Sequence, residues 1–220
     1  ISEDLLKEGA RFWLDLWGKD FSDSRLICYY IDGNTKPIWS SKHVKKNKVT
    51  MLGRVMGCLE QVFIHDGRGH PIYFETYSGH APVGKHLLEM FDKVEDMIQD
   101  MPGKNSSVCR ALVLDSSSNS VATLRSFVQQ NKFHYITPLD DNQWNERQVI
   151  KQSSILRYKY GAASLVNLEY ELEDSKEKGY IVRTRAVKVD WDNGRTIVLL
   201  TSLPDFITAG EVVYSYFKRW

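Results

Sequence analysis

The chain has 220 residues, of which 42% are hydrophobic and 26% are charged, and its formal net charge is +1 at pH 7. These values indicate one globular domain, or one domain with an insertion, that can bury a core. A net charge of +1 does not by itself indicate nucleic-acid binding, so any such function would depend on local clusters of basic residues. No apolar run approaches the ~18–20 residues of a membrane span, and the polar, acidic start does not resemble a signal peptide.

The three cysteines, Cys28, Cys58 and Cys109, each lie in an apolar, strand-like run and show no paired spacing. This pattern argues against a zinc site or a disulfide framework and is typical of reduced, buried thiols. We therefore expect a cytoplasmic protein.

Strands dominate the first part of the chain. Apolar residues at helical spacing predict a helix over residues 3–17, and a continuous apolar run predicts a strand, buried on both faces, over residues 25–31. We expect this strand to end in a turn at Asp32, followed by a polar, basic loop over residues 40–48. The sequence Asp-Gly-Arg-Gly at 66–69, between two apolar runs, predicts a hairpin of antiparallel strands.

Helices and strands then alternate. The pattern predicts an amphipathic helix over residues 85–99, a buried strand over 108–114 that ends at Asp115, a helix capped by Ser120, and a strand over 133–136. Three meandering strands followed by helix, strand, helix and strand predict an α/β fold, a mixed sheet with helices on its faces.

The pattern changes between residues 139 and 194, where alternating strands separated by turns predict an all-β insertion. A buried strand is predicted again over residues 196–201, and a helix from Pro204 to the end of the chain at Trp220. Both ends of the chain fall in helix-like material without a stop signal, which indicates a piece of a longer protein.

Two carboxylates, Asp32 and Asp115, are the candidate catalytic and metal-binding residues, because each follows a short apolar strand. Ligands of open α/β sheets collect beyond such strand ends. If the two strands are neighbours, the carboxylates can bind Mg²⁺, and two such ions can activate a nucleophile and stabilise the leaving oxygen of a phosphodiester. The alternative is that either aspartate only forms a turn or caps a helix.

Five segments, in order, resemble DDE-type insertion-sequence transposases. They are residues 31–35 with Pro37 and Ser40 (the first-aspartate motif), 66–79 (a hairpin running into a glycine), 112–115 (the second-aspartate strand), 199–202 with Pro204 (the strand before the third carboxylate) and 216–220 (the opening of the Y-x-x-R-x-x-x-E signature). The resemblance covers nearly the whole chain.

The resemblance implies an RNase H-like fold with a five-stranded mixed sheet. Residues 1–138 would form the first part of the catalytic core, 139–194 a β-rich insertion, and 195–220 the return to the core. It implies metal-dependent nicking and strand transfer on DNA with Mg²⁺ (or Mn²⁺ as a substitute). The implied partners are transposon ends and target DNA, with a possible homodimer on DNA, and the implied location is the prokaryotic nucleoid within the cytoplasm.

This chain departs from the pattern at two places. The third carboxylate of the family, a glutamate, would lie four residues after Arg219, beyond the sequence given, so we expect the 220-residue chain alone to be inactive. Where some relatives have a base-stacking tryptophan, this chain has Ile197. Trp191 or Trp144 could take that role, or both could simply pack within the insertion.

Several residues are candidates for DNA contacts. The resemblance implies that Tyr216 and Arg219 point toward the DNA backbone. The alternative is that both side chains only pack their helix against the fold. The lysines of the basic loop could bind phosphate or could form a solvated surface, and the same alternatives hold for the exposed face expected of the insertion. The loop lysines are Lys42, Lys45, Lys46 and Lys48, and the residues on the insertion face are Lys151, Arg157, Lys159, Arg183 and Arg185.

Two other functions remain open from the sequence. One is a non-catalytic transposase remnant that binds DNA or regulates transposition. The other is a general RNase H-like nuclease, against which the β-rich insertion and the Tyr-x-x-Arg pair argue.

Overall fold

The computed structural model divides the chain into two compact units, residues 1–25 with 29–108 and residues 26–28 with 109–220. The structure describes residues 8–9, 12, 25–40, 44–79, 83–99, 108–140, 144–152, 158–160, 163–174 and 179–219. Of the helix predicted over residues 3–17, the described residues are Glu8, Gly9 and Phe12, which are helical. The rest of that prediction lies outside the described residues.

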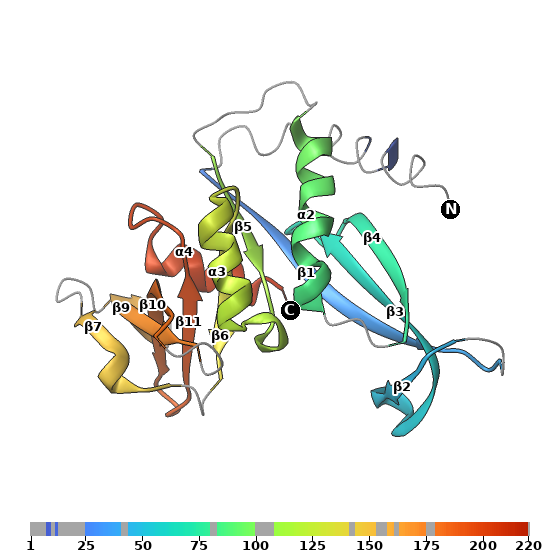
Figure 1. Cartoon of the computed structure of the whole chain (residues 1–220). Helices are drawn as coiled ribbons and strands as arrows, with labels where there is room; N and C mark the ends of the chain where they lie inside the picture. The colour runs from blue at the N-terminus through green and yellow to red at the C-terminus, as the bar shows by residue number, and fades with distance from the viewer. Residues whose placement is uncertain are drawn as a thin grey trace. The chain divides into compact units, whose positions relative to one another are not determined.

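The first unit contains an antiparallel sheet centred on the long strand β3, with β1 on one edge (Figure 1). On its other edge β3 pairs first with β2 and then with β4. The changeover is at Cys58, whose N–H donates to the carbonyl of Lys45 and whose carbonyl accepts from Gly79. The β3–β4 pairing confirms the predicted hairpin. The elements are β1 (Leu26–Pro37), β2 (Lys46–Val49), β3 (Arg54–His65), β4 (Pro71–Ser78) and α2 (Val83–Gln99).

Two expectations for this unit are wrong in detail. β1 does not end at Asp32 but continues to Pro37, and Asp32 lies opposite Phe63 within the ladder. The local turn signal is overridden because β3 is long enough to pair with every residue of β1 from Tyr30 onward. Part of the predicted basic loop is likewise a strand, β2, because residues 46–49 pair with the start of β3.

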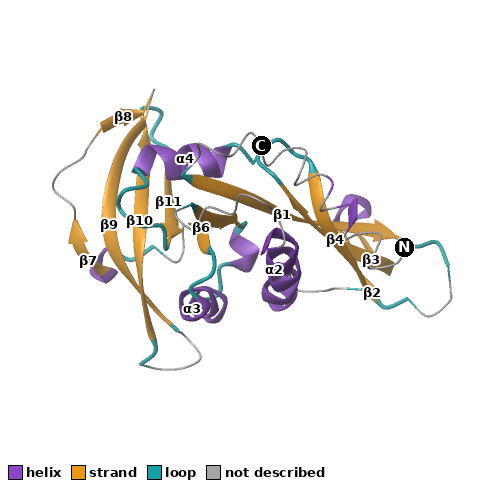
Figure 2. Ribbon diagram, turned by 90° about the horizontal axis from the view of Figure 1, so that it is seen from above, coloured by secondary structure: helices purple, strands orange, loops and turns teal. Residues whose placement is uncertain are grey.

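The second unit contains a mixed sheet with the strand order β5-β6-β11-β10-β9-β7, which Figure 2 shows from β7 to β6. β5 and β6 are parallel and the other pairs are antiparallel. The helix α3 connects β5 to β6 and begins as predicted, because the Ser120 side chain accepts a hydrogen bond from the N–H of Thr123. The elements are β5 (Cys109–Val113), α3 (Val121–Gln130), β6 (His134–Leu139), β7 (Val149–Gln152), β8 (Tyr158–Tyr160), β9 (Ala163–Glu173), β10 (Ile181–Trp191), β11 (Thr196–Thr201) and α4 (Ala209–Phe217).

The stretch predicted as an all-β insertion contributes β7, β8, β9 and β10, and its described residues include no α-helix. These strands do not form a separate small sheet. β10 pairs with β11 from Arg185 to Asp190, and β11 in turn pairs with β6, so the ladder runs without a break from β9 to β5.

Both units have apolar cores. In the first, Leu87, Met90 and Val94 of α2 are buried at helical spacing, as the amphipathic pattern predicts. In the second, α3 and α4 pack on the sheet. The chain is thus a mixed α/β protein with open sheets, and among the residues that the structure describes no helix is long and apolar enough to cross a membrane.

Candidate active site

Asp115 follows the buried strand β5 after one further buried residue, Leu114, as the sequence predicts. It precedes a 3-10 turn over Ser116–Ser118, but its side chain makes no capping hydrogen bond to that turn. Its backbone carbonyl accepts from the hydroxyl of Thr137 on β6, and the Ser118 hydroxyl lies 3.4 Å from its Oδ1. The backbone is thus held by the neighbouring strand, while the carboxylate is 47% exposed. Asp115 thus does not cap the turn with its side chain, but its backbone carbonyl accepts from the N–H of Ser118, in line with the turn-forming alternative.

The Tyr-x-x-Arg pair lies beside this carboxylate, although the two segments are far apart in sequence. Nη2 of Arg219 is 3.9 Å from Oδ2 of Asp115, and the Arg219 side chain is only 5% exposed. Tyr216 is also buried. The sequence predicted a helix up to Trp220, but α4 ends at Phe217, and Arg219 lies in the following turn with its N–H bonded to the carbonyl of Tyr216.

The electrostatics of Tyr216 reflect the same proximity. Burial raises the pKa of its phenol above the ordinary value, the positive charge of Arg219 opposes that shift, and the negative charge of Asp115 adds to it. Tyr216 therefore stays protonated at neutral pH and keeps a hydroxyl that can donate a hydrogen bond. Within the second unit, the structure brings together one carboxylate, one guanidinium and one phenol.

Another acidic residue, Glu211, lies in the first turn of α4. Glu211 accepts from the N–H of Thr208, and the Thr208 hydroxyl accepts from the N–H of Glu211. This capping box gives Glu211 a structural role.

Asp32 belongs to the first unit, where it is exposed on β1. Lys45, Lys46 and Lys48 are also in that unit and are exposed on or next to β2. Lys42 lies outside the described residues.

Arg183 and Arg185 of β10 have different surroundings. Arg183 is 80% exposed and forms an ion pair of 2.9 Å with Glu171. The Arg185 side chain is only 9% exposed, so the expectation that it belongs to an exposed face is wrong. Its guanidinium donates to Asn167 Oδ1 and to the carbonyls of Pro204 and Ile207, because the turn before α4 folds over this part of β10. Arg157 lies outside the described residues, as do the side chains of Lys151 and Lys159.

The two tryptophans considered for base stacking pack against other aromatic rings of the second unit. The Trp144 ring stacks on Tyr170 with centroids 5.2 Å apart, and Trp191 meets the edge of Phe217 at 5.5 Å. Trp144 thus packs within residues 139–194, as the alternative has it, whereas Trp191 contacts α4, outside that stretch.

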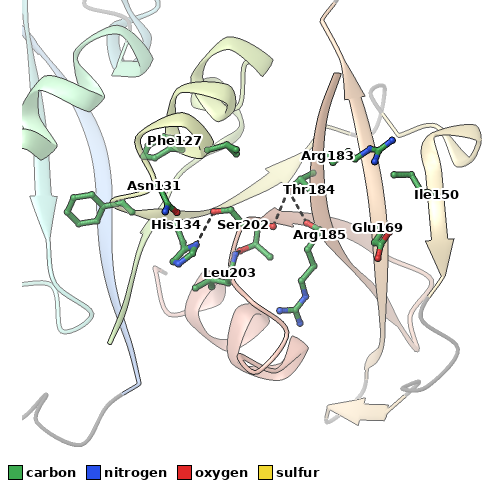
Figure 3. A pocket seen from close by; sticks show the side chains of 13 residues that line it. Phe127, Asn131, His134, Ile150, Glu169, Arg183, Thr184, Arg185, Ser202 and Leu203 are labelled. Carbon is green, nitrogen blue, oxygen red and sulfur yellow. Dashed lines mark hydrogen bonds between the residues drawn. The ribbon is translucent and has the colours of Figure 1, made fainter. Parts of the chain in front are cut away.

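A cavity of about 370 Å³ lies elsewhere in the second unit, between α3 and the strands β6, β10 and β11 (Figure 3). Asp115, Tyr216 and Arg219 are not among its lining residues. His134 and Ser202 approach each other at its wall, with 3.3 Å between Nδ1 and Oγ. Ser202 Oγ also accepts the N–H of Tyr135, which gives this pair a role in joining β11 to β6.

Sequence reasoning missed two buried threonines, one that holds the backbone of Asp115 and one that joins β11 to β6. Thr137 and Thr201 are both fully buried, and their hydroxyls donate to the carbonyls of Asp115 and Tyr135. A threonine inside an otherwise apolar strand was the available signal, since a buried hydroxyl needs a partner.

Asp32 and Asp115 each have a solvent-accessible carboxylate, and carboxylate oxygens are the ligands that a hard divalent cation prefers. Among the described residues, no group of three or more His, Cys, Asp or Glu side chains is placed to hold a metal ion.

No protein-family model matches the chain, and no curated protein shows significant similarity to it.

Proposed function

We propose that this chain carries the catalytic core of a DDE-type transposase, which cuts and joins DNA by two-metal phosphoryl transfer. The observation that carries the proposal is the meeting of Asp115 with Tyr216 and Arg219 within the second unit. The sequence resemblance assigns these residues to one active site, and its second-aspartate motif and its Tyr-x-x-Arg motif, about 100 residues apart in the chain, lie next to each other in the structure.

The arrangement of strands supports an RNase H-like core. The first unit contains the antiparallel group β1, β3 and β4, and the second contains the β5–α3–β6 unit with parallel strands. The hydrophobic pattern predicts three meandering strands followed by alternating helices and strands, and the resemblance implies that this fold is RNase H-like.

In this proposal Asp32 and Asp115 hold Mg²⁺ through carboxylate oxygens. The bound metal supplies activation of the attacking hydroxyl and stabilisation of the leaving oxygen. Arg219 is almost completely buried beside Asp115, so in this proposal its guanidinium has to become exposed before it binds a DNA phosphate in a bidentate manner. Protonated Tyr216 donates a hydrogen bond to the same backbone. Asp115 and Arg219 also partly neutralise each other's charge until metal and phosphate arrive.

The direct test compares the 220-residue chain with a chain extended past Trp220 to include the glutamate expected four residues after Arg219. Plasmid nicking is measured with Mg²⁺ and Mn²⁺. We expect nicking by the longer chain only, because two carboxylates leave most of the octahedral shell to water and bind Mg²⁺ weakly. Asp115→Asn and Asp32→Asn should each abolish nicking.

The matched control is Asp192→Asn, which changes an exposed aspartate in the turn between β10 and β11 and should leave nicking intact. Robust nicking by the 220-residue chain that Asp32→Ala abolishes would show that the third acid has been misplaced. A longer chain that binds DNA but never nicks it would favour the non-catalytic remnant.

A further inference from the structure

The hairpin formed by β2 and the start of β3 has an unusual charge. No Asp or Glu occurs between Asp32 and Glu60, whereas six Lys or Arg residues do, namely Lys36, Lys42, Lys45, Lys46, Lys48 and Arg54. The whole chain has a net charge of +1, so the remaining residues carry a net charge of 1 − 6 = −5. Residues 46–57 together with Trp39 are called the basic arm below. Positive charge is thus concentrated in the basic arm and the chain segments next to it.

The basic arm carries cations on both faces. Lys48 lies opposite Val55 in the ladder, and Val49 lies opposite Arg54, so the two pairs point to opposite sides. Lys46 shares the face of Lys48, and both are exposed. On the other face the Arg54 guanidinium lies 4.7 Å from the centroid of the Trp39 ring. A molecule that accepts this arm has to present negative charge on two sides.

Large apolar side chains are exposed between these cations. Trp39 is 75% exposed although Arg54 covers part of its ring, and Met51, in the turn at the tip, is 82% exposed. Leu52 and Val55 are also exposed. Several large exposed apolar side chains on one short hairpin are typical of an interaction site.

The form of the arm also fits this role. β4 ends at Ser78, and beyond the changeover at Cys58 the strands β2 and β3 continue as a two-stranded ribbon, at the end of β3 remote from the β3–β4 turn (Figure 1). The tip is closed by a 3-10 turn over Thr50–Leu52 and by Gly53 with φ +63°. The DNA major groove, about 12 Å wide, admits a two-stranded β-ribbon and lies between two rows of phosphates.

We propose that the basic arm is a β-ribbon that enters a groove of duplex DNA. Lys46 and Lys48 contact the phosphates on one side, Arg54 with Trp39 contacts the sugar–phosphate backbone on the other, and Met51 at the tip meets the base edges. This inference deepens the proposed function, on which it rests for the choice of DNA as the partner. The basic arm would then be a DNA-binding element of the first unit, separate from the site around Asp115.

Fluorescence anisotropy of a labelled duplex with the 220-residue chain, in EDTA and at 50–200 mM salt, tests the arm separately from catalysis. Each lysine–phosphate contact contributes a slope of about −0.9 to log K against log salt. The variant Lys46→Gln with Lys48→Gln should therefore make the slope shallower by about 2 and weaken binding most at low salt. Because both side chains are exposed, circular dichroism and thermal unfolding should be unchanged.

The matched control is Lys132→Gln with Arg195→Gln, which removes the same charge from exposed positions of the second unit and should leave the slope unchanged. Met51→Glu, which places a negative charge at the exposed tip, should weaken binding several-fold. An unchanged slope in the arm variant, an equal change in the control, or no duplex binding by the unmodified chain would overturn the inference.

Light scattering without DNA tests whether the basic arm instead contacts a second copy of the chain. Self-association that Met51→Glu abolishes would assign the arm to contact with a second copy of the chain and would also overturn the inference. The two proposals fail separately. Loss of duplex binding in the arm variants, with no nicking by the extended chain, would refute catalysis alone, whereas nicking that is insensitive to the arm variants would refute the arm alone.

Discussion

Arg183 and Arg185 are two residues apart on β10 and project to the same side of the sheet, yet their environments differ completely. Arg183 reaches into solvent and pairs with Glu171, whereas Arg185 is covered by the turn that leads into α4 and donates to two backbone carbonyls. Exposed ion pairs contribute little to stability, but a buried guanidinium with several acceptors leaves them unsatisfied when it is removed.

Replacing the two arginines one at a time should reveal this difference. We expect Arg185→Ala to lower the free energy of unfolding by about 2–4 kcal/mol, because the carbonyls of Pro204 and Ile207 and the side chain of Asn167 lose their donor. Arg183→Ala should change it by less than about 0.5 kcal/mol. Urea titrations of both variants measure the effect, and equal midpoints would contradict the structural role of Arg185.

At the scale of elements, the changeover between β4 and β2 along β3 depends on a close backbone approach. Gly79 has φ +77°, and a Cβ built there would lie 2.5 Å from the Cβ of Lys45. Gly69, in the turn between β3 and β4, has a similar φ of +83° but no atom within 4 Å of the corresponding position. Gly69 is thus needed only for its positive φ, whereas Gly79 is needed both for its positive φ and because a Cβ would collide with Lys45.

The two glycines form a matched pair for mutation. Gly69→Ala should destabilise the first unit by about 1 kcal/mol through left-handed strain alone. Gly79→Ala should cost about 3 kcal/mol, because the strand edge at Lys45 must also move. Thermal unfolding measures both, and a Gly79→Ala variant no less stable than Gly69→Ala would show that β2 can shift freely along β3.

At the scale of the whole molecule, the two units differ in their titratable groups. In the first unit, burial alone would raise the pKa of Asp66, but hydrogen bonds from the side chain and backbone of His70 and from the N–H of Arg68 outweigh it and hold the pKa below 3.8. In the second unit His134 is the only histidine, and burial lowers its pKa below 6.5 despite an opposing contact with Ser202. The second unit should therefore respond to mild acid before the Asp66 turn does.

The direction of this response follows from proton linkage. As pH falls below 6.5, the unfolded chain binds a proton at His134 before the folded chain does, so stability that is complete above pH 6.5 decreases. We expect amide protection of β6 and β11, corrected for the intrinsic pH dependence of exchange, to fall between pH 7 and pH 5. His134→Asn, which cannot titrate, should show flat protection over this range. An unchanged pH dependence in that variant would assign the effect to another group.

Most elements of this protein could be predicted from the sequence alone, because their signals are local. The turn at 66–69, the cap at Ser120, the strand over 196–201 and the amphipathic helix before Gln99 each depend on residues a few positions apart, and all were found where the pattern predicts them. The position of Asp115 at a strand end was predictable for the same reason.

Which strand edges and side chains are covered depends on contacts between distant parts of the chain. β1 runs past Asp32 because β3 offers it a partner, and the predicted insertion continues the main sheet because β11 pairs with both β10 and β6. Arg185 is buried because a turn nearly twenty residues later in the chain folds over it. Hydrogen bonds between distant strands and turns outweigh local turn and exposure preferences, and no short stretch of sequence carries that information.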